Sequence, residues 1–425
     1  MSPSIRIAIS GGGLAGASLI HALLSYPQLD VHIFESQPTF REAGMAIGLA
    51  RNALAALDLI GPSAAQCLER AGAVPMRGVR YMLAQGDDAG KLIDQTDDSD
   101  ERRVTSIVHR AAFLKELLVD VPQDRMHAGK KLVRIDRNDD GSNLLHFTDG
   151  TTHECDILIG ADGIRSFIRK FILGENDPAA FPRNTGSWAV MTLKSYAEAQ
   201  ASLGNDAVNI EDARECMWIG NGAYLLHNLL NTPQGPLVQF VVASYEKDAE
   251  ESDRWHRTVS VDEIRKIYQD WPPHLYNAVD KLLCDQPKQP AIYLWEHPPA
   301  HTYTSGSICI TGDAAHATSP WQGSGGSMSI EDTLILSTLL GRAKTTAEAL
   351  AALKVYDQVR RPRTQQIVES SRDTGLIMLG LGEWTKLDLQ KLRASLLRRW
   401  DFIVDFDNEM HRNEALEMME KELIS

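Results

Sequence analysis

The sequence is short of the features that mark secreted and membrane-spanning proteins. Its five cysteines lie far apart and form no C-x-x-C pair, which argues against a zinc site and a disulfide framework and indicates a reducing compartment. Residues 374–384 form an apolar segment, but it has only about half of the roughly 20 residues that a membrane span needs. We therefore expect it to form a buried or interfacial helix.

Positive charge is also scarce. The formal net charge is −14, and no long basic stretch interrupts the acidic chain, so nucleic acid and anionic membrane surfaces are poor candidates as partners. These shortages predict a cytoplasmic protein without stable membrane insertion. The 425 residues, of which 43% are hydrophobic and 24% charged, suffice for two or three ordinary globular domains.

A glycine-rich stretch stands almost at the start of the chain. Residues 9–24 read ISGGGLAGASLIHALL and place Gly11, Gly13 and Gly16 in the spacing G-x-G-x-x-G, directly after a strand-like apolar run. The spaced glycines and the lack of a basic leader argue against a secretion signal. A helical pattern follows, and a second strand-like run then ends in Glu35, about 20 residues after the glycines.

This order of strand, glycine turn, helix, strand and acid predicts a dinucleotide-binding unit. Gly11 would permit the tight turn, Gly13 would let the backbone approach a pyrophosphate, and Gly16 would let the helix pack close to the strand. The helix N-terminus offers free N–H groups to the phosphates. Glu35 can accept hydrogen bonds from a ribose diol and would repel a ribose phosphate, so NAD and FAD remain open and NADP is disfavoured at this site.

Two later motifs choose between these cofactors. Residues 155–169, CDILIGADGIRSFIR, are an apolar strand that ends in Ala-Asp-Gly at Asp162. Residues 308–332, ICITGDAAHATSPWQGSGGSMSIED, are another apolar strand that ends in Gly-Asp at Asp313, before a glycine-rich turn and a helix. Taken alone, either aspartate could simply cap a helix. Next to the first motif, both are expected to bind the cofactor.

The turn before the last of these helices gathers backbone N–H groups at Gly325 and Gly326. Together with the helix N-terminus they form a positive end. Such an end suits the pyrimidine edge of a flavin, where negative charge accumulates in the reduced ring. The third motif therefore favours FAD.

With these three motifs in order, the chain resembles the class A, single-component FAD-dependent aromatic hydroxylases, and within them the salicylate hydroxylases and their fungal relatives. The similarity covers roughly residues 5–365 and includes Arg110, in VHRAAFLKELL, which matches the family's FAD-contacting arginine. It implies that a small-residue loop, residues 43–48, flanks the isoalloxazine ring and that Gly48 contacts FAD through its backbone. It also implies that Asp162 serves both FAD and the nicotinamide cofactor.

The resemblance implies an α/β fold, with an FAD-binding Rossmann-like domain, an antiparallel β-sheet substrate domain as in para-hydroxybenzoate hydroxylase, and a helical C-terminus. We expect the FAD-binding domain to be discontinuous. The expected bounds are 1–75, 104–180 and 296–360 for the FAD-binding domain, 76–103 and 181–295 for the substrate-binding domain, and 361–425 for the helical C-terminal region.

The resemblance further implies non-covalent FAD and, since no second G-x-G-x-x-G appears, NADH or NADPH as a transient co-substrate. Reduced flavin would capture dioxygen as a flavin hydroperoxide and hydroxylate a phenolic or salicylate-like aromatic substrate. One alternative is a related flavin monooxygenase that acts on a heteroaromatic or polyketide-derived substrate by epoxidation or oxidative dearomatisation. Another is a flavin-binding protein without redox turnover. A monomer or a homodimer is expected.

A group that takes or shares the phenolic proton is expected in the substrate pocket. The strand-like segment GAYLLHNLL offers Tyr224 and His227, which lie an odd number of positions apart and would face opposite sides of a strand. We favour Tyr224, with His227 as the alternative. Pro320 and Trp321 are expected to line the pocket. Trp321 would form an aromatic wall where salicylate hydroxylases often carry a histidine.

A cation for a substrate carboxylate is not evident in the same region. Some dearomatising fungal relatives use an arginine near the start of the substrate sheet, and no arginine lies between residues 184 and 213. His316 follows the Gly-Asp motif and is predicted to be structural.

Overall fold

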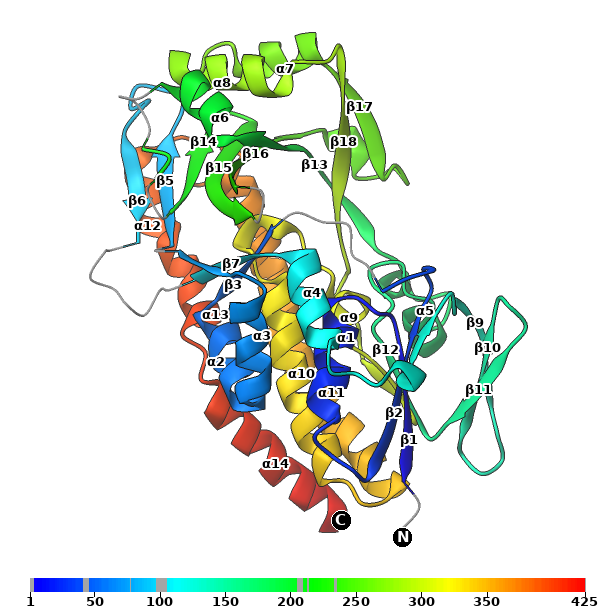
Figure 1. Cartoon of the computed structure of the whole chain (residues 1–425). Coiled ribbons are helices and arrows are strands. Elements are labelled where there is room, and N and C mark those ends of the chain that lie inside the picture. Colours follow the sequence, from blue (N-terminus) through cyan, green and yellow to red (C-terminus); the bar gives the residue numbers. More distant parts are fainter. Residues whose placement is uncertain are drawn as a thin grey trace.

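A six-stranded, mostly parallel sheet carries the N-terminal glycine turn (Figure 1). This computed structural model describes residues 4–40, 46–76, 78–96, 105–204, 209–211, 214–232 and 235–424. Its inner strand β1 (Ile5–Ser10), which directly precedes the glycine turn, is almost entirely buried because helices cover the sheet. In order across the sheet, the strands are β19 (Thr304–Ser305), β20 (Ile308–Ile310), β12 (Ile157–Gly160), β1 (Ile5–Ser10), β2 (Leu29–Glu35) and β8 (Met126–Ala128).

Helix α10 (Gly325–Arg342) forms the centre of the helical part of the molecule (Figure 1). Nearly every side chain from Ser327 to Leu340 is buried, because the helix packs against α1, α2, α11 and α14. The helices of this part are α1 (Leu14–Leu23), α2 (Arg51–Ile60), α3 (Pro62–Arg70), α4 (Arg110–Leu118), α5 (Phe167–Leu173), α9 (Asp313–His316), α11 (Thr346–Met378), α12 (Leu389–Ser395), α13 (Asp401–Val404) and α14 (Asn408–Ile424).

A second, eight-stranded sheet lies at the upper end of the view in Figure 1. Its pairs are antiparallel except for β14 with β5, which run parallel, because β5 comes from a separate segment much earlier in the chain. In order, the strands are β17 (His256–Ser260), β18 (Lys288–Glu296), β13 (Arg183–Ser195), β16 (Gly235–Tyr245), β15 (Ala223–Thr232), β14 (Glu215–Ile219), β5 (Val79–Leu83) and β6 (Leu92–Gln95).

The two faces of this large sheet have different neighbours. One face packs against α6 (Tyr196–Leu203), α7 (Val261–Tyr268) and α8 (Pro273–Leu283), and together they form an apolar core that includes Trp218 and Phe240. The other face points toward the helical part of the molecule and borders a cavity. Because side chains alternate along a strand, the parity of a residue decides which environment it meets.

Two three-stranded sheets complete the described strands. One contains β3 (Ala46–Ala50), β7 (Thr105–His109) and β4 (Val74–Met76), and the other contains β11 (Thr152–Cys155), β10 (Asn143–Phe147) and β9 (Leu132–Arg137). The loop predicted at residues 43–48 is therefore a strand from Ala46 onward, because β3 pairs with β7. Residues 43–45 lie outside the described residues.

The C-terminal helices begin earlier than the sequence indicated. Helix α11 runs from Thr346 to Met378 without a break at Pro362, so the predicted domain bound at residue 360 falls inside one helix. The helix predicted for residues 374–384 is also shorter, since α11 ends at Met378 and Gly380 turns the chain with a φ of +67°. The other predicted domain bounds stay predictions. Within the described ranges, no helix combines the length and apolar character needed to cross a bilayer.

Candidate active site

A cavity of about 710 Å³ lies at the carboxyl ends of β1, β2 and β12. The three sequence motifs converge on it although they are far apart in the chain. Nine of the ten predicted cofactor-binding residues line it, and Pro320 joins them. These residues are Gly11, Gly13, Glu35, Gly48, Arg110, Asp162, Asp313, Gly325 and Gly326.

The tenth residue, Gly16, lies behind the glycine turn and shapes it. A Cβ atom on Gly16 would come within 1.9 Å of the Gly11 carbonyl oxygen. Gly11 itself has a φ of +116°, and a Cβ there would lie 2.1 Å from the Ala161 oxygen. Both positions are closed to any side chain, so β1, α1 and β12 can approach one another only with glycine in place.

Glu35 holds the same turn from the end of β2. Its Oε2 accepts a hydrogen bond from the Gly12 N–H at 2.7 Å, and its Oε1 accepts one from the Gln37 N–H, also at 2.7 Å. The carboxylate therefore orders the glycine turn and borders the cavity at once.

The Asp162 carboxylate accepts three hydrogen bonds from nearby groups of the protein. Its Oδ2 accepts hydrogen bonds from the backbone N–H groups of Phe167 at 2.8 Å and Ile168 at 3.2 Å, and its Oδ1 accepts one from the Ser166 hydroxyl at 2.5 Å. The carboxylate thus caps the start of α5, which is the cap alternative that the sequence left open. Asp162 also lines the cavity, and its contact with the cofactor stays a prediction.

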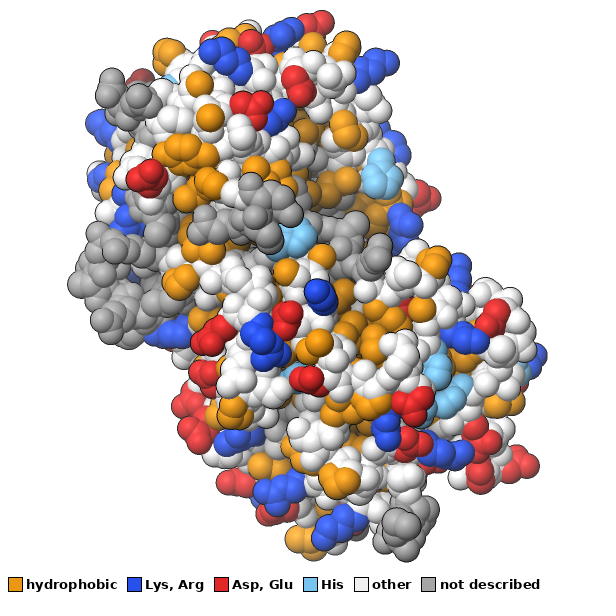
Figure 2. All heavy atoms as spheres, viewed as in Figure 1, with side chains coloured by type: hydrophobic (Ala, Val, Ile, Leu, Met, Phe, Trp, Pro, Cys, Tyr) orange, Lys and Arg blue, Asp and Glu red, His pale blue; other side chains and the backbone are white. Residues whose placement is uncertain are grey.

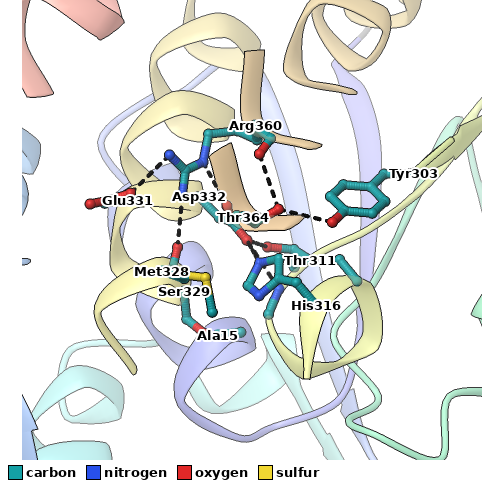
Figure 3. A network of polar contacts seen from close by, with 12 residues as sticks. Ala15, Tyr303, Thr311, His316, Met328, Ser329, Glu331, Asp332, Arg360 and Thr364 are labelled. Carbon is teal, nitrogen blue, oxygen red and sulfur yellow. Dashed lines mark hydrogen bonds and ion pairs between the residues drawn. The ribbon is translucent and has the colours of Figure 1, made fainter. Parts of the chain in front are cut away.

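Asp313 faces the cavity because a buried ion network fixes the turn before it (Figure 3). Asp332 on α10 is the hub of this network. Its Oδ2 accepts hydrogen bonds from the Thr311 hydroxyl at 3.0 Å and the Gly312 N–H at 3.2 Å, and lies 2.6 Å from His316 Nε2. His316 is structural in this arrangement, as predicted.

Two arginines of α11 balance the acids of α10. Arg360 Nε donates to Asp332 Oδ1 at 2.8 Å, and its Nη1 lies 2.9 Å from Glu331 Oε2. Arg363 donates to the same glutamate, as does Asn52 on α2. Burial alone would raise both pKa values, but the attraction of Arg360 and Arg363 lowers the pKa of Glu331 to about 2. The interactions with His316 and Arg360 likewise hold the pKa of Asp332 below its usual range. No sequence motif indicates this network. From the sequence, residue 360 is expected only to mark the end of the FAD-binding domain.

The cavity suits FAD on the chemistry of its walls. The N-termini of α1 and α10 border it, and the first N–H groups of a helix have no partner within the helix, so both ends favour anionic or electron-rich groups. Glu35 is placed for a ribose diol and Asp313 for a hydroxyl group. The residues present therefore fit the cofactor that the motifs indicated.

A second cavity, of about 610 Å³, adjoins the first. The two share Ala46, Ile47, Gly48, Arg110, Pro320 and Gly323 as lining residues. On the face shown in Figure 2, hydrophobic side chains gather where the large sheet meets the helical part of the molecule. A compound in the second cavity would therefore lie next to the cofactor groove.

One face of the eight-stranded sheet forms a wall of the second cavity. Its contributors alternate along each strand, as a single sheet face requires. They are Val79 on β5, Glu215 and Met217 on β14, Tyr224 and Leu226 on β15, Gln239, Val241 and Ala243 on β16, Ala189 and Met191 on β13, and Ile292 and Leu294 on β18. The wall is mainly apolar, which suits an aromatic ring.

Tyr224 and Trp321 meet in this wall. Their rings lie edge to face, with centroids 5.4 Å apart and an interplanar angle of 80°. The indole of Trp321 packs directly against Gly375 of α11. A Cβ at that position would lie 2.4 Å from the indole ring, so only glycine leaves room for it. Burial raises the pKa of Tyr224 well above its usual range, so its hydroxyl stays protonated. Pro320 lines both cavities.

His227 lies on the opposite face of the sheet from Tyr224. Its Nε2 is 3.4 Å from the Trp218 indole nitrogen, and its ring packs against Phe240 in the core beneath α8. Burial lowers the pKa of His227 to about 4. Because it does not line either cavity, its position does not support the alternative catalytic assignment.

Glu215 is a cavity residue that the sequence motifs did not reveal. It precedes the apolar run CMWIG and lines the second cavity beside Met217. Desolvation raises the pKa of Glu215 to about 7. The signal was present in the sequence, since a strand pattern with Met217 facing a pocket puts Glu215 on the same face.

Comparison with known proteins places the chain in a family. Residues 4–371 match the FAD binding domain family. The chain is 33% identical to 6-methylsalicylate 1-monooxygenase of Aspergillus terreus, over 98% of this chain and 93% of that relative. It is 34% identical to a salicylate hydroxylase of Sarocladium schorii, over 87% of this chain and 80% of that relative. A solved salicylate hydroxylase substrate complex superposes with a TM-score of 0.82 at 25% identity, over 97% and 98% of the two chains.

The chain therefore belongs to the FAD binding domain family. The protein is an FAD-dependent monooxygenase, with NADH or NADPH as the co-substrate. The predicted resemblance, the α/β fold class and the cofactor are confirmed. The roles of individual site residues stay predictions.

Proposed function

We propose that the protein hydroxylates a phenolic or salicylate-like aromatic compound in the second cavity, and that Tyr224 contacts the substrate hydroxyl. The observation that carries this proposal is the junction of the two cavities at Gly48, Arg110 and Pro320. An aromatic ring held against the sheet wall would lie beside the flavin groove. Relatives named for 6-methylsalicylate and salicylate support the same substrate class.

The chain's own residues orient the substrate and exclude water. Bound FAD would supply the redox chemistry, since it accepts a hydride from NADH or NADPH and activates dioxygen. Apolar side chains such as Met217, Leu226 and Val241 line the substrate side and keep water from the reacting atoms. The protonated Tyr224 hydroxyl donates a hydrogen bond to the substrate oxygen, which stabilises the negative charge that activates the ring.

Replacing Tyr224 by phenylalanine tests its role. In the FAD-loaded enzyme, Tyr224→Phe should slow oxygen transfer by about a hundredfold and leave flavin reduction by NADH or NADPH intact. Oxidation of the nicotinamide would then yield hydrogen peroxide in place of hydroxylated product. The measurement is the ratio of product formed to nicotinamide oxidised, alongside stopped-flow flavin reduction.

Tyr268→Phe is the matched control. The Tyr268 hydroxyl donates to the Tyr224 backbone oxygen at 2.7 Å from the helix-covered face of the sheet, so its loss removes a hydrogen bond worth about 1 kcal/mol without touching the cavity. Full coupling in Tyr224→Phe would contradict the assignment. A loss of coupling in His227→Asn with full coupling in Tyr224→Phe would give the role to the histidine.

A substrate panel tests the reaction itself. Oxidation of NADH or NADPH by the purified holoenzyme is measured with salicylate, 6-methylsalicylate, simple phenols and indoles, and products are identified by mass. Stimulated oxidation with a hydroxylated phenol as product is the expected result. Turnover of indoles alone would favour the heteroaromatic alternative, and no turnover with any compound would contradict the proposal.

A cytoplasmic location and a monomeric or homodimeric state belong to the same proposal. All five cysteines are free thiols in the structure, which supports a reducing compartment. Light scattering on the eluted holoenzyme measures the assembly, and fractionation of the source cells measures the location.

A further inference from the structure

The sheet wall of the second cavity has polar side chains at both ends and an apolar row between them. Strand pairing places Leu226 of β15 opposite Met217 of β14 and Val241 of β16, and these three side chains form the apolar row. Tyr224 lies two residues from Leu226 toward one end of the wall. Gln239 lies two residues from Val241 toward the other end, because β16 runs antiparallel to β15.

The end of the wall away from Tyr224 gathers hydrogen-bond acceptors. Gln239 lies directly opposite Asn228 of β15, and Glu215 borders the cavity two residues from Met217 on the same side of the apolar row. The Oε1 of Gln239 and the Oδ1 of Asn228 are buried and accept no hydrogen bond within the described part of the chain. Because leaving a buried acceptor without a donor is costly, this end of the wall suits a ligand group that donates a hydrogen bond.

Tyr224 and Gln239 are too far apart to bind the same ligand atom. Their rows are four residues apart along β15, and a strand rises about 3.3 Å per residue, so the rows lie about 13 Å apart. Two hydrogen bonds of about 2.8 Å each leave roughly 7–10 Å between the two ligand oxygens. Two oxygens on one benzene ring lie closer together than this. A cavity of about 610 Å³ has room for a longer compound.

We propose that the substrate carries a second hydroxyl group on a side chain or a second ring, and that Gln239 hydrogen-bonds this distal hydroxyl. This inference rests on the proposed function, from which it takes the contact between Tyr224 and the hydroxyl of the reacting ring. The apolar row packs against the atoms between the two hydroxyl groups. Since an amide carries an acceptor and two donors, either end of the Gln239 amide can bind the distal hydroxyl. Gln239 is then a specificity-determining residue that favours long aromatic compounds over small phenols.

Two phenols of the same shape test the distal contact. In 4-(3-hydroxypropyl)phenol an O–H group replaces the terminal methyl group of 4-butylphenol. Their Kd values for the FAD-loaded enzyme are measured from the change in flavin absorbance, for wild type and for Gln239→Met, which keeps the side-chain length and removes the amide. The variant should bind the hydroxypropyl compound about tenfold more weakly and 4-butylphenol no more weakly than wild type does. An equal change for both ligands, or no change for either, would overturn the proposal.

The position of the hydroxyl group tests the distance between the two contacts. The compounds 4-hydroxybenzyl alcohol, 4-(2-hydroxyethyl)phenol and 4-(3-hydroxypropyl)phenol carry this group progressively farther from the phenol oxygen. The loss of affinity caused by Gln239→Met should grow along the series, because only the longest compound reaches both ends of the wall. A loss that is as large for 4-hydroxybenzyl alcohol would contradict the proposed contact at two ends.

The melting temperature separates a ligand contact from a structural role. In the ligand-free holoenzyme, Gln239→Met removes an acceptor that has no donor, so the variant should melt at or above the wild-type temperature. A clear fall in melting temperature would show that Gln239 stabilises the fold and would contradict the assignment. Gln239→Glu keeps an acceptor and should bind the hydroxypropyl compound better than Gln239→Met does. An equal loss of affinity in the two variants would rule out a hydrogen bond accepted at this position.

Gln289→Met is the matched control, since Gln289 on β18 donates to Asp285 at 2.9 Å and lines neither cavity. It should bind both phenols as wild type does. If wild type hydroxylates no phenol, the proposed function has failed, while a selective loss of the hydroxypropyl ligand in Gln239→Met would still support the contact at Gln239. If wild type hydroxylates phenols and Gln239→Met binds both probes as wild type does, only this inference has failed.

Discussion

The two adjoining cavities differ in which parts of the chain form their walls. Backbone turns and helix N-termini form most of the cofactor cavity, and a buried ion network fixes the turn that precedes Asp313. Side chains that alternate along six strands form the sheet wall of the substrate cavity. A backbone turn tolerates almost no change, whereas an apolar wall tolerates exchange of similar side chains. Changes in the first cavity should therefore cost stability and FAD, and changes in the second should alter coupling and selectivity.

The largest effect is expected from the network beneath the cofactor cavity. Asp332→Asn removes one charge from a fully buried pair with Arg360, and breaking such a pair costs about 3–5 kcal/mol of unfolding free energy. The amide keeps a single acceptor oxygen for both Arg360 and the Gly312 turn, so the turn is weakened and FAD content should fall. Thermal melting and the flavin absorbance of the purified variant measure both effects. Because the pKa of Glu331 is lowered to about 2, the stability from its charge should disappear as the pH falls from about 4.5 toward 2.

Glu422→Gln is the control for this prediction, since Glu422 pairs with Lys354 at the surface and such pairs contribute about 0–1 kcal/mol. A melting temperature for Asp332→Asn equal to that of wild type would mean that the network does not stabilise the cofactor cavity.

A steric test at the glycine turn should come next in size. Gly11→Ala places a Cβ against the Ala161 oxygen at a strained φ, and a cost of about 3 kcal/mol corresponds to about a hundredfold loss of FAD affinity. Gly48→Ala is the matched variant, because no atom lies within 4 Å of its Cβ. The apoprotein of Gly48→Ala should melt like wild type. If Gly48→Ala nevertheless loses FAD, the predicted backbone contact at Gly48 gains support.

A smaller loss is expected where single carboxylates meet the cofactor. Asp313→Ala and Glu35→Ala each remove a charged hydrogen-bond partner, worth roughly 1.5–3 kcal/mol, or about tenfold or more in FAD affinity. Glu35→Gln separates charge from shape, because the amide oxygen can still accept from the Gly12 N–H. Equilibrium titration of apoprotein with FAD gives the affinities. Wild-type affinity in both alanine variants would show that the predicted contacts are wrong.

The smallest effect on stability is expected at Glu215 in the substrate cavity and should depend on pH. The pKa of Glu215 is raised in the folded protein to about 7, so its contribution to stability is complete at low pH and is lost as the pH rises toward and through 7. Glu215→Gln removes this loss. Relative to wild type, the variant should therefore gain about 1–3 °C in melting temperature at pH 8 compared with pH 5. An equal difference at both pH values would mean that Glu215 is not desolvated.

The contrast between the cavities also explains what could be predicted. The cofactor residues sit in short motifs whose glycines dictate local backbone shape, so the local sequence was enough to assign Gly11, Glu35 and Asp313 to the cofactor cavity. Asp162 was found by the same motif, but its side chain caps α5. The sequence could not separate these two uses, since both need an aspartate at a strand-to-helix turn.

The sequence by itself determined the cofactor and the fold class, through three motifs in order and the family resemblance that they carry. It also determined the parity of Tyr224 and His227, which follows from their spacing along a strand. Only the tertiary structure decided which of those two residues meets the cavity, since that depends on α6, α7 and α8 covering the other face of the sheet. It also decided that Arg360 balances Asp332 across two helices. This pair joins residues that are distant in the chain, and local patterns carry no information about which distant side chains come to share one buried space.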